Sequence, residues 1–374
     1  MINKQRLLAS FLRLLEINSP SRKEGAVAAV ISDQLRDLGF DIKIDCAGDA
    51  LGGETGNMIA TLPARGTGGR NILLCSHMDT VQPTEGIQVI QEDGIIRQQG
   101  AAVLGADDKG GIAAILEGVR AVRESDDDHG QIQVVILICE EIGLFGSKLL
   151  DMSMVSSEFA YVFDSGQPVG HLVSAAPTHD NMIITFRGRA AHAGVCPEEG
   201  ASSIIAASRA ISAMKLGRID AETTANVGVI SGGSARNIIP ENCELRAEAR
   251  SRDTAKLDRQ VAEMRKACEQ AASATGCEVS IEVTREDLGY RHQRKDELIR
   301  FALKAANSIG LNPEFVAHGG GSDCNIMNAK GLPTVVIGVG YEKIHTPDEF
   351  IGISELERCA EYAEAVVRTS GLKD

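Results

Sequence analysis

Short apolar runs alternate with helical segments along this chain, and this alternation constrains its fold more than any other feature of the sequence. Between two of the runs, residues 112–122 carry apolar side chains at helical spacing. Strands that alternate with helices predict a mostly parallel sheet with helices on both faces, so the expected fold class is α/β. The strands are expected at residues 71–75, 132–139, 159–163 and 334–339.

Two helices are expected before the first of these strands. Residues 1–15 mix leucines with lysine and arginine, which predicts an amphipathic helix and excludes the uninterrupted apolar region of a signal peptide. The sequence from Ser21 to Glu24 has the pattern of a capping box, in which both side chains bond to backbone amides at the start of a helix. Apolar residues then recur at helical spacing up to Gly39, which predicts a surface helix.

The pattern of the chain changes between residues 176 and 290. Strands and helices are expected there in the order β-α-β-β-α-β, which is a split βαβ, or ferredoxin-like, unit that can form a small domain. A chain of 374 residues exceeds the size at which a single core stops growing, so two domains are expected. Residues 1–175 and 291–374 are expected to form the larger domain, and residues 176–290 an inserted one.

Charge and composition argue against several classes of function. The net charge of -14 and the isoelectric point near 5.1 oppose binding to a phosphate backbone, so no nucleic-acid partner is expected. The longest apolar run, residues 134–139, is too short to cross a membrane, and no membrane span is expected. Nine cysteines without a Cys-x-x-Cys pair fit neither a disulfide framework nor a zinc ribbon. They indicate reduced thiols in a cytoplasmic protein.

The first candidate site follows the apolar run that ends at residue 75. His77 and Asp79 would lie on one side of an extended chain, and a neutral imidazole beside a carboxylate binds a divalent metal well. A strand end whose two side chains merely face solvent explains this motif equally well.

The second candidate is the glycine-flanked loop that contains Asp107, Asp108 and Lys109. A helix start needs only one aspartate as its N-cap. Two aspartates and a lysine go beyond capping, and the two oxygens of a carboxylate can bridge a pair of metal ions.

The third candidate is the pair Glu140 and Glu141 at the end of the most hydrophobic strand. Carboxylates beside a buried strand are costly unless positive charge meets them. Neighbouring side chains of a strand diverge, so one glutamate is suited to ligate metal and the other to act as general base. A solvated junction between strand and loop is the alternative.

Asp164 and His345 follow two further expected strands, and each alone would be an ordinary turn residue. Together with the earlier candidates they lie at or beyond the carboxyl ends of parallel strands, where open α/β sheets bind ligands. A set of imidazoles and carboxylates without thiolates suits zinc, manganese or cobalt.

At these residues the chain resembles a family of co-catalytic metallopeptidases that includes peptidase T, carboxypeptidase G, aminoacylase and succinyl-diaminopimelate desuccinylase. The order of His-x-Asp, an Asp-x-Lys-Gly loop, Glu-Glu, Asp and a late His runs the length of the chain, and the inserted domain agrees. The closing His-Thr-Pro-Asp-Glu is most similar to peptidase T. The resemblance implies a hydrolase with two divalent metal ions, expected to be zinc, with manganese or cobalt as alternatives. The implied metal ligands are His77, Asp107, Glu141, Asp164 and His345.

The same resemblance assigns a role to each residue. Asp107 is implied to bridge both ions, Asp79 to orient an imidazole, and Glu140 to be the general base. The other ligands divide between the ions, with His77 and Asp164 on one and Glu141 and His345 on the other.

The inserted domain is implied to be a lid and dimerisation domain that binds substrate. His192 matches the lid histidine, which polarises the scissile carbonyl, often from the partner subunit of a homodimer. Asn237 and Arg250 match positions that grip the substrate, and a guanidinium suits a free carboxylate. Gly320 lies in a glycine-rich loop that resembles the substrate-binding loop of the family. This loop departs from peptidase T, which carries an arginine and a threonine there.

We expect hydrolysis of an amide bond in short peptides, as in a tripeptide aminopeptidase, with a metal-bound water and a glutamate base. An N-acyl-amino-acid amidohydrolase or a carboxypeptidase would use the same metals and the same arginine. From a different class, a catalytically silent peptide-binding protein would retain the fold. A nucleophilic hydrolase is disfavoured because the chain has no Gly-x-Ser-x-Gly elbow.

Overall fold

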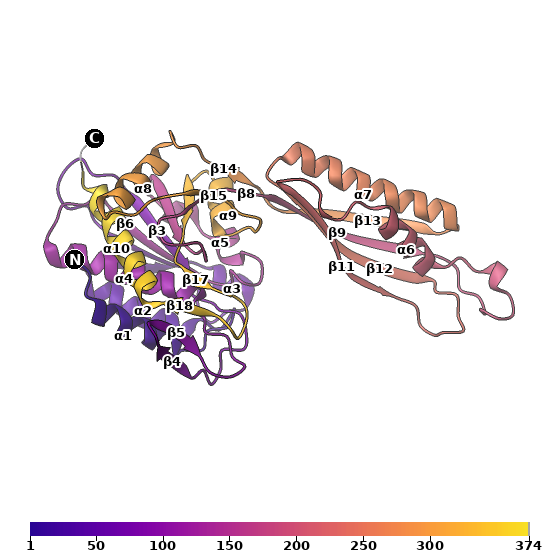
Figure 1. The fold of residues 1–374 in the computed structure, drawn as a ribbon, viewed down its shortest axis with the longest axis horizontal. Coiled ribbons are helices and arrows are strands. Elements are labelled where there is room, and N and C mark those ends of the chain that lie inside the picture. The colour runs from indigo at the N-terminus through magenta and orange to yellow at the C-terminus, as the bar shows by residue number, and fades with distance from the viewer. Residues whose placement is uncertain (373–374) are drawn as a thin grey trace. The chain divides into compact units, whose positions relative to one another are not determined.

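Buried parallel strands form the centre of the largest sheet in the computed structural model, which describes residues 1–372 (Figure 1). Every residue in these strands is buried, and each strand pairs in parallel with its neighbour. The α/β class and the strands expected from the sequence are therefore confirmed. In spatial order the strands are β6 (Ile132–Leu137), β3 (Ile72–His77), β7 (Phe159–Phe163) and β16 (Thr334–Ile337).

Antiparallel strands extend this sheet on both sides. On one side β2 (Met58–Leu62) lies between β6 and β1 (Asp41–Ile44). On the other side β8 (Leu172–Ala176) pairs with β16. Two short strands, β14 (Tyr290–Arg291) and β15 (Phe315–Ala317), pair with β8. The parallel strands thus occupy the middle of a mixed sheet, where both faces can be covered.

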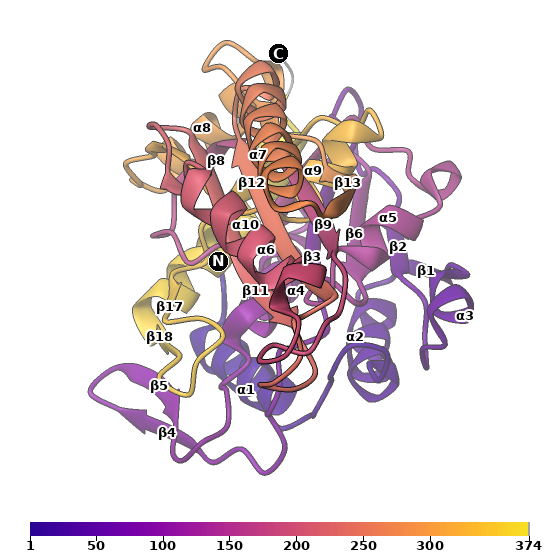
Figure 2. The same ribbon diagram turned by 90° about the vertical axis from the view of Figure 1, so that its right-hand side faces the viewer.

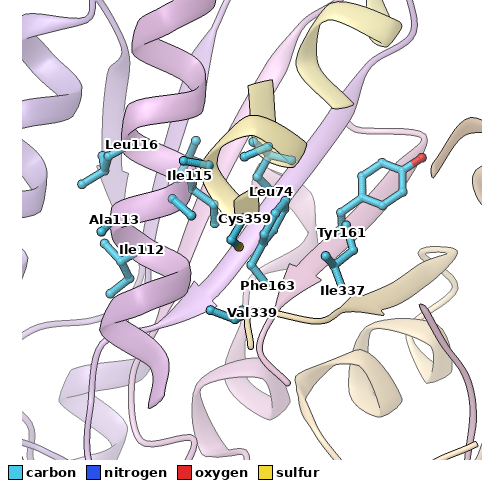
Figure 3. Packing of buried hydrophobic residues seen from close by; sticks show 14 of the residues in the cluster. Leu74, Ile112, Ala113, Ile115, Leu116, Tyr161, Phe163, Ile337, Val339 and Cys359 are labelled. Carbon is cyan, nitrogen blue, oxygen red and sulfur yellow. The ribbon is translucent and has the colours of Figure 1, made fainter. Parts of the chain in front are cut away.

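Long helices cover one face of the sheet. They are α1 (Lys4–Leu15), α2 (Gly25–Asp37), α4 (Ala106–Ser125), α8 (Glu297–Ser308) and α10 (Ile353–Ser370). Their buried residues share one apolar cluster with alternate residues of the strands, such as Leu74 and Tyr161 (Figure 3). Leu73 and Cys75 alternate with these positions and are equally buried outside the cluster, so the opposite face is covered as well. Shorter helices complete this part: α3 (Ala47–Leu51), α5 (Phe145–Leu149), η1 (Met152–Met154) and α9 (Asp323–Ala329).

A small antiparallel sheet joins two distant parts of the sequence. Its order is β17 (Tyr341–Glu342), β18 (Phe350–Gly352), β5 (Ile95–Gln98) and β4 (Val89–Glu92). The side-chain amide of Gln98 also donates to the carbonyl oxygen of Pro347 at 3.0 Å. This sheet fixes the loop that contains His345 beside the segment that leads into α4.

The capping box expected at Ser21 and Glu24 is wrong. Helix α2 begins at Gly25, the side chain of its N-cap residue Glu24 makes no capping hydrogen bond, and the amide of Gly25 donates instead to Glu54 at 3.2 Å. Ser21 and Glu24 bond instead to residues beyond the ends of β3 and β6, described below. A capping box does exist at α9, where Ser322 and Asn325 bond to each other's backbone amides.

The chain divides into two compact units. The first contains Met1–Ser174, His292–Ala317 and the chain from Ser322 onward, and the second contains Ala175–Arg291 and His318–Gly321. Residues 318–321, which the sequence analysis placed in the larger domain, belong to the second unit. None of the helices in the described part of the chain has the length and apolar character needed to span a membrane.

The second unit is a five-stranded antiparallel sheet with two helices on one face (Figure 2). In chain order its elements are β9 (Thr178–Arg187), η2 (Pro197–Glu199), α6 (Ser203–Ala213), β10 (Gly217–Arg218), β11 (Thr223–Gly232), β12 (Asn242–Ser251), α7 (Thr254–Thr275) and β13 (Glu278–Asp287); across the sheet the order is β10-β11-β12-β9-β13. Along β9, which lies between β12 and β13, Met182, Ile184 and Phe186 are buried under the helices, whereas Ile183 is 45% exposed. This two-residue period is that of a sheet covered on one side.

Candidate metal centre and active site

Polar side chains gather where the parallel strands of the first unit end. His77 is the last residue of β3, Asp164 directly follows β7, and Glu140 and Glu141 follow β6. Since the carboxyl ends of parallel strands meet at one edge, these residues lie close together. His345 reaches the same place from the loop between β17 and β18, with a left-handed backbone at φ 61°.

Among the described residues, candidate ligand atoms form three groups: one joins His77, Glu140 and Glu141, and the other two share Asp107. In the first of the two groups that share Asp107, His77 Nε2 lies 3.3 Å from Asp107 Oδ1 and 3.9 Å from Asp164 Oδ1. In the second, His345 Nε2 lies 3.4 Å from Asp107 Oδ2 and 3.1 Å from Glu141 Oε2. All ligand atoms within each group lie within 4.8 Å of one another. One carboxylate thus presents one oxygen to each histidine, which is the arrangement a bridging ligand requires.

A buried glutamate holds the backbone that carries Asp107. Glu349 is fully buried, and its carboxylate oxygens accept the amide hydrogens of Gly105 at 2.8 Å and Asp107 at 2.9 Å. Asp107 and Asp108 depart from helical φ and ψ values at the start of α4, and the peptide bond between them is cis. The first backbone N–H groups of a helix have no acceptor within the helix, and Glu349 supplies acceptors for those of Gly105 and Asp107.

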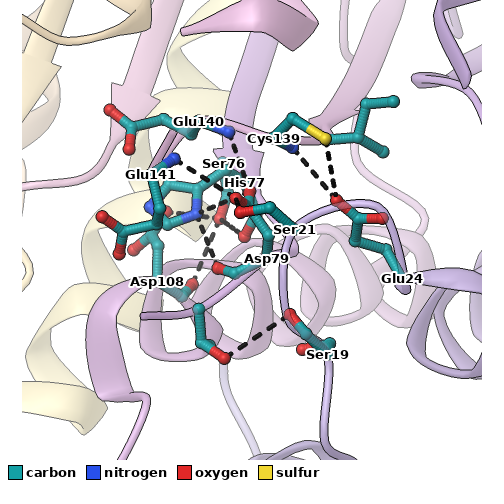
Figure 4. Close-up of polar contacts among 12 residues, drawn as sticks. Ser19, Ser21, Glu24, Ser76, His77, Asp79, Asp108, Cys139, Glu140 and Glu141 are labelled. Carbon is teal, nitrogen blue, oxygen red and sulfur yellow. Dashed lines mark hydrogen bonds and ion pairs between the residues drawn. The ribbon is translucent and has the colours of Figure 1, made fainter. Parts of the chain in front are cut away.

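Asp79 contacts both the histidine and the glutamate pair (Figure 4). The Nδ1 atom of His77 lies 2.9 Å from the carbonyl oxygen of Asp79, which can only accept, so Nδ1 donates and Nε2 faces Asp107. The Asp79 carboxylate accepts the amide hydrogens of Glu140 at 2.9 Å and Glu141 at 3.2 Å. One buried carboxylate thus connects the chain after β3 to the chain after β6.

The carboxyl groups of Asp107, Asp164 and Glu141 crowd one another and are largely buried. Burial raises the pKa of Asp164 to about 7 and the pKa of Glu140 well above its usual range. Burial also opposes ionisation of Asp107, but hydrogen bonds from His345 and His77 hold its pKa below the ordinary value. The acidic side chains outnumber the histidines, so full ionisation of these carboxyl groups requires additional cations beside them.

The donor set fits divalent metal ions. Imidazole nitrogens and carboxylate oxygens without thiolates suit zinc, manganese or cobalt. Glu141 Oε1 is a buried oxygen without a hydrogen-bond partner among residues 1–372, as expected of an atom that coordinates a metal. Tyr341 donates its hydroxyl hydrogen to Asp164 Oδ1 at 2.8 Å, which leaves the other oxygen of Asp164 available.

The four residues expected to bind substrate belong to the second unit and fall into separate places. The backbones of His192 and Ile238 form a β-bridge, and the amide of Ala193 donates to the carbonyl oxygen of Asn237 at 2.9 Å. Arg250 lies at the far end of β12, where its guanidinium bonds to both oxygens of Glu248. The amide of Gly320 donates to His318 Nδ1 at 3.1 Å. The structure brings His192 and Asn237 together and separates them from Arg250.

Sequence patterns did not indicate which residues hold the candidate metal ligands in place. Glu349 lies in the quoted His-Thr-Pro-Asp-Glu motif, and Tyr341 follows the last parallel strand, but neither was given a role. Ser21 and Glu24 were assigned to a helix cap. Their polar contacts join segments far apart in sequence, so spacing along the chain contains no signal for them.

An α/β scaffold with histidines and carboxylates clustered at the carboxyl edge of its sheet defines a class of metal-dependent enzymes. Comparison with known proteins gives the particular family, because the family described as Peptidase family M20/M25/M40 matches residues 73–369. The chain belongs to this family and is a metallopeptidase. The resemblance noted from the sequence is confirmed.

Similarity to individual proteins extends over the full chain. The protein YqjE of Bacillus subtilis (strain 168) is 42% identical over 98% of this chain and 99% of its own length. The structure of aminopeptidase PepT from Bacillus cereus ATCC 10987 is 40% identical, with a TM-score of 0.94 over 99% of this chain and 100% of that chain. A tripeptidase from Staphylococcus aureus subsp. aureus Mu50 is 38% identical, with a TM-score of 0.96 over 99% of both chains.

Proposed function

We propose that this metallopeptidase hydrolyses an amide bond in short peptides, as a tripeptide aminopeptidase does. The observation that carries the proposal is Asp107, whose two oxygens each face one histidine. Similarity over almost the whole chain to an aminopeptidase PepT and to a tripeptidase supports the substrate class.

Two divalent ions, most suitably zinc, would be held by the two groups that share Asp107. His77 and Asp164 would hold one ion, and Glu141 and His345 the other, since the two histidines face opposite oxygens of Asp107. When bound, the ions would polarise the scissile carbonyl and lower the pKa of a water molecule. Asp79 would keep His77 in the tautomer that presents Nε2.

Glu140 is proposed as the general base. Its carboxylate lies within 4.8 Å of ligand atoms of His77 and Glu141, while its backbone is fixed through the amide that bonds to Asp79. It would take a proton from the attacking water and deliver it to the nitrogen of the leaving amine.

Arg250 is proposed to bind the free carboxylate of the substrate, and His192 to polarise the scissile carbonyl together with Asn237. Asn242 and Arg250 occur at opposite ends of β12, about 26 Å apart at a rise of ~3.3 Å per residue. One short substrate cannot bridge that length within a single unit. This separation supports a homodimer in which the partner subunit supplies His192, and Gly320 would contribute backbone contacts to the substrate.

The substrate preference can be tested with a peptide library and the metal-loaded enzyme, analysed by mass spectrometry. Tripeptides with free amino termini should lose their first residue, and protein purified in parallel with Glu140→Gln should leave them intact. N-acetylated peptides or N-acyl amino acids cut instead would support the amidohydrolase or carboxypeptidase alternative, which also needs Arg250. No hydrolysis of any of these substrates by protein with full metal occupancy would reject the proposal. Reduced cysteines support a cytoplasmic location.

A further inference from the structure

The segment from Ile17 to Glu24 contacts three loops of the candidate metal centre. We propose that it is a positioning element for that centre, in which Ser21 and Glu24 fix the backbone that presents Asp79, Glu140 and Glu141. The proposal rests on the proposed function for its consequence in catalysis, but its structural part concerns the ligand geometry alone.

The first contact is with the chain after β3 (Figure 4). The hydroxyl of Ser21 donates to Asp79 Oδ2 at 2.6 Å, and the amide of Thr80 donates to the carbonyl oxygen of Ser19 at 3.0 Å. Asp79 is completely buried, so its carboxylate has few directions in which it can move. Ser21 therefore selects the orientation in which the same carboxylate accepts the amides of Glu140 and Glu141.

The second contact is with the chain after β6. Glu24 is completely buried, and its Oε1 atom accepts the amide hydrogen of Cys139 at 3.1 Å. The next two amides, of Glu140 and Glu141, donate to Asp79. Three successive amides are thus bonded to carboxylates, and Cys139 has a left-handed backbone at φ 52°. Such a conformation persists only where the surroundings impose it.

The third contact is with the loop that carries Asp107. Lys109 is completely buried, and its ammonium group donates to the carbonyl oxygen of Ile17 at 2.6 Å. The segment therefore joins the loops after β3 and β6 and the start of α4, which between them supply ligands to both metal groups.

The same side chains do not serve the helix that follows them. Ser21 and Glu24 have the spacing of a capping box, yet the N-cap Glu24 makes no capping bond, and Glu54 instead accepts the amide hydrogen of Gly25 in the first turn of α2. Substitution of either residue should therefore act on the metal centre more than on the helix. Partners that orient ligands typically change metal affinity or activity by about 10- to 100-fold when they are removed.

The test uses the full chain loaded with cobalt(II), whose visible absorption reports ligand geometry, and with zinc for kinetics and chelator competition. Ser21→Ala and Glu24→Ala should alter the cobalt spectrum, weaken metal binding and lower kcat by about ten-fold with KM nearly unchanged. Glu24→Gln retains an oxygen that accepts from Cys139, so it should restore the spectrum and most of kcat.

Two control variants match these changes away from the site. Ser10→Ala removes a hydroxyl that bonds to Gln34, and Glu117→Gln alters a buried carboxylate that pairs with Arg6. Both should retain the spectrum and kcat of the unchanged protein, even if Glu117→Gln lowers the melting temperature.

The outcomes separate the two proposals. An unchanged cobalt spectrum, metal affinity and kcat in Ser21→Ala and Glu24→Ala would overturn the positioning role, as would a Glu24→Gln variant as defective as Glu24→Ala. If Glu24→Ala does not fold, Ser21→Ala and Glu24→Gln decide the question. Absence of peptidase activity in the unchanged protein would reject the proposed function, while the spectra would still test the positioning role.

Discussion

At the scale of residues, the site depends on carboxylates that each serve two partners. Asp107 faces both histidines, Asp79 accepts two amides and a hydroxyl, and Glu349 accepts the amides on either side of Ala106. A carboxylate with two oxygens can fix two groups at once, whereas an amide or a hydroxyl cannot accept in the same way. Substitution of Asp107 should therefore affect metal binding, whereas substitution of the proposed base Glu140 should affect proton transfer.

Asp107→Ala and Glu140→Gln should differ in what they lose. Asp107→Ala removes an oxygen from both groups, so the protein should lose most of its bound metal along with its activity. Glu140→Gln keeps the shape of the side chain but cannot accept a proton, so both metals should remain while kcat falls by about 10²- to 10⁴-fold. Metal analysis and steady-state kinetics measure the two effects. A Glu140→Gln variant with the kcat of the unchanged protein would show that Glu140 is not the general base.

Metal affinity should fall as the pH is lowered. In the metal-free chain, hydrogen bonds to Asp107 and Glu141 raise the pKa of His345 to about 10, so this histidine is protonated at neutral pH. Metal binding must then release a proton, and the affinity should drop about ten-fold per pH unit for each proton released below that pKa. Chelator competition between pH 6 and 8 measures this slope, and a flat profile would contradict it.

The pairing of His345 with Asp107 and Glu141 has the opposite pH dependence in its effect on stability: it stabilises the metal-free chain most at low pH, where metal affinity should be lowest. Because the folded pKa of His345 lies above its ordinary value of 6.5, its contribution to stability is complete below pH 6.5 and is lost as the pH rises through about 10.

At the scale of elements, close packing of α4 on α10 positions the helix whose first turn contains Asp107. The packing depends on Gly118, where an added Cβ would meet the Cβ of Ala363 and the backbone nitrogen of Glu364, both at 2.7 Å. The two helices also contact the same apolar cluster under the sheet.

Gly118→Ala should therefore destabilise the protein although alanine favours a helix. Overpacking costs about 1–3 kcal/mol, which outweighs a gain of at most ~1 kcal/mol in helix propensity. Thermal unfolding should show a lower midpoint, whereas Gly228→Ala, whose new Cβ meets no atom closer than 3.5 Å, should change it less. A higher midpoint for Gly118→Ala would show that the helices move apart at little cost.

At the scale of the whole molecule, the residues proposed to bind substrate occur in a different unit from the proposed metal ligands. The two ends of β12 present different groups, with His192 and Asn237 near one end and Arg250 at the other. In the proposed homodimer, His192 and Asn237 of one subunit and Arg250 of the other would contact the same substrate.

Subunit complementation tests this arrangement. His192→Ala and Glu140→Gln should each be nearly inactive alone. Dissociated and mixed in equal amounts, they should recover roughly a quarter of full activity, because a mixed two-fold dimer regains one intact site. Two Glu140→Gln preparations mixed in the same way provide the control. No recovery in mixtures shown to contain mixed dimers would place His192 in its own subunit's site.

The sequence by itself determined the α/β class, the central strands and the set of residues at their carboxyl ends. These follow from local periodicity and from the rule that parallel strands end at one edge, which relates position in the chain to position in space. Only the tertiary structure decided how Ser21, Glu24 and Glu349 are used. Ser21 and Glu24 have the spacing of a helix cap, and the tertiary contacts that override it join residues 58 and 115 positions apart. Long-range hydrogen bonds of this kind depend on how strands and loops meet, which local sequence patterns do not encode.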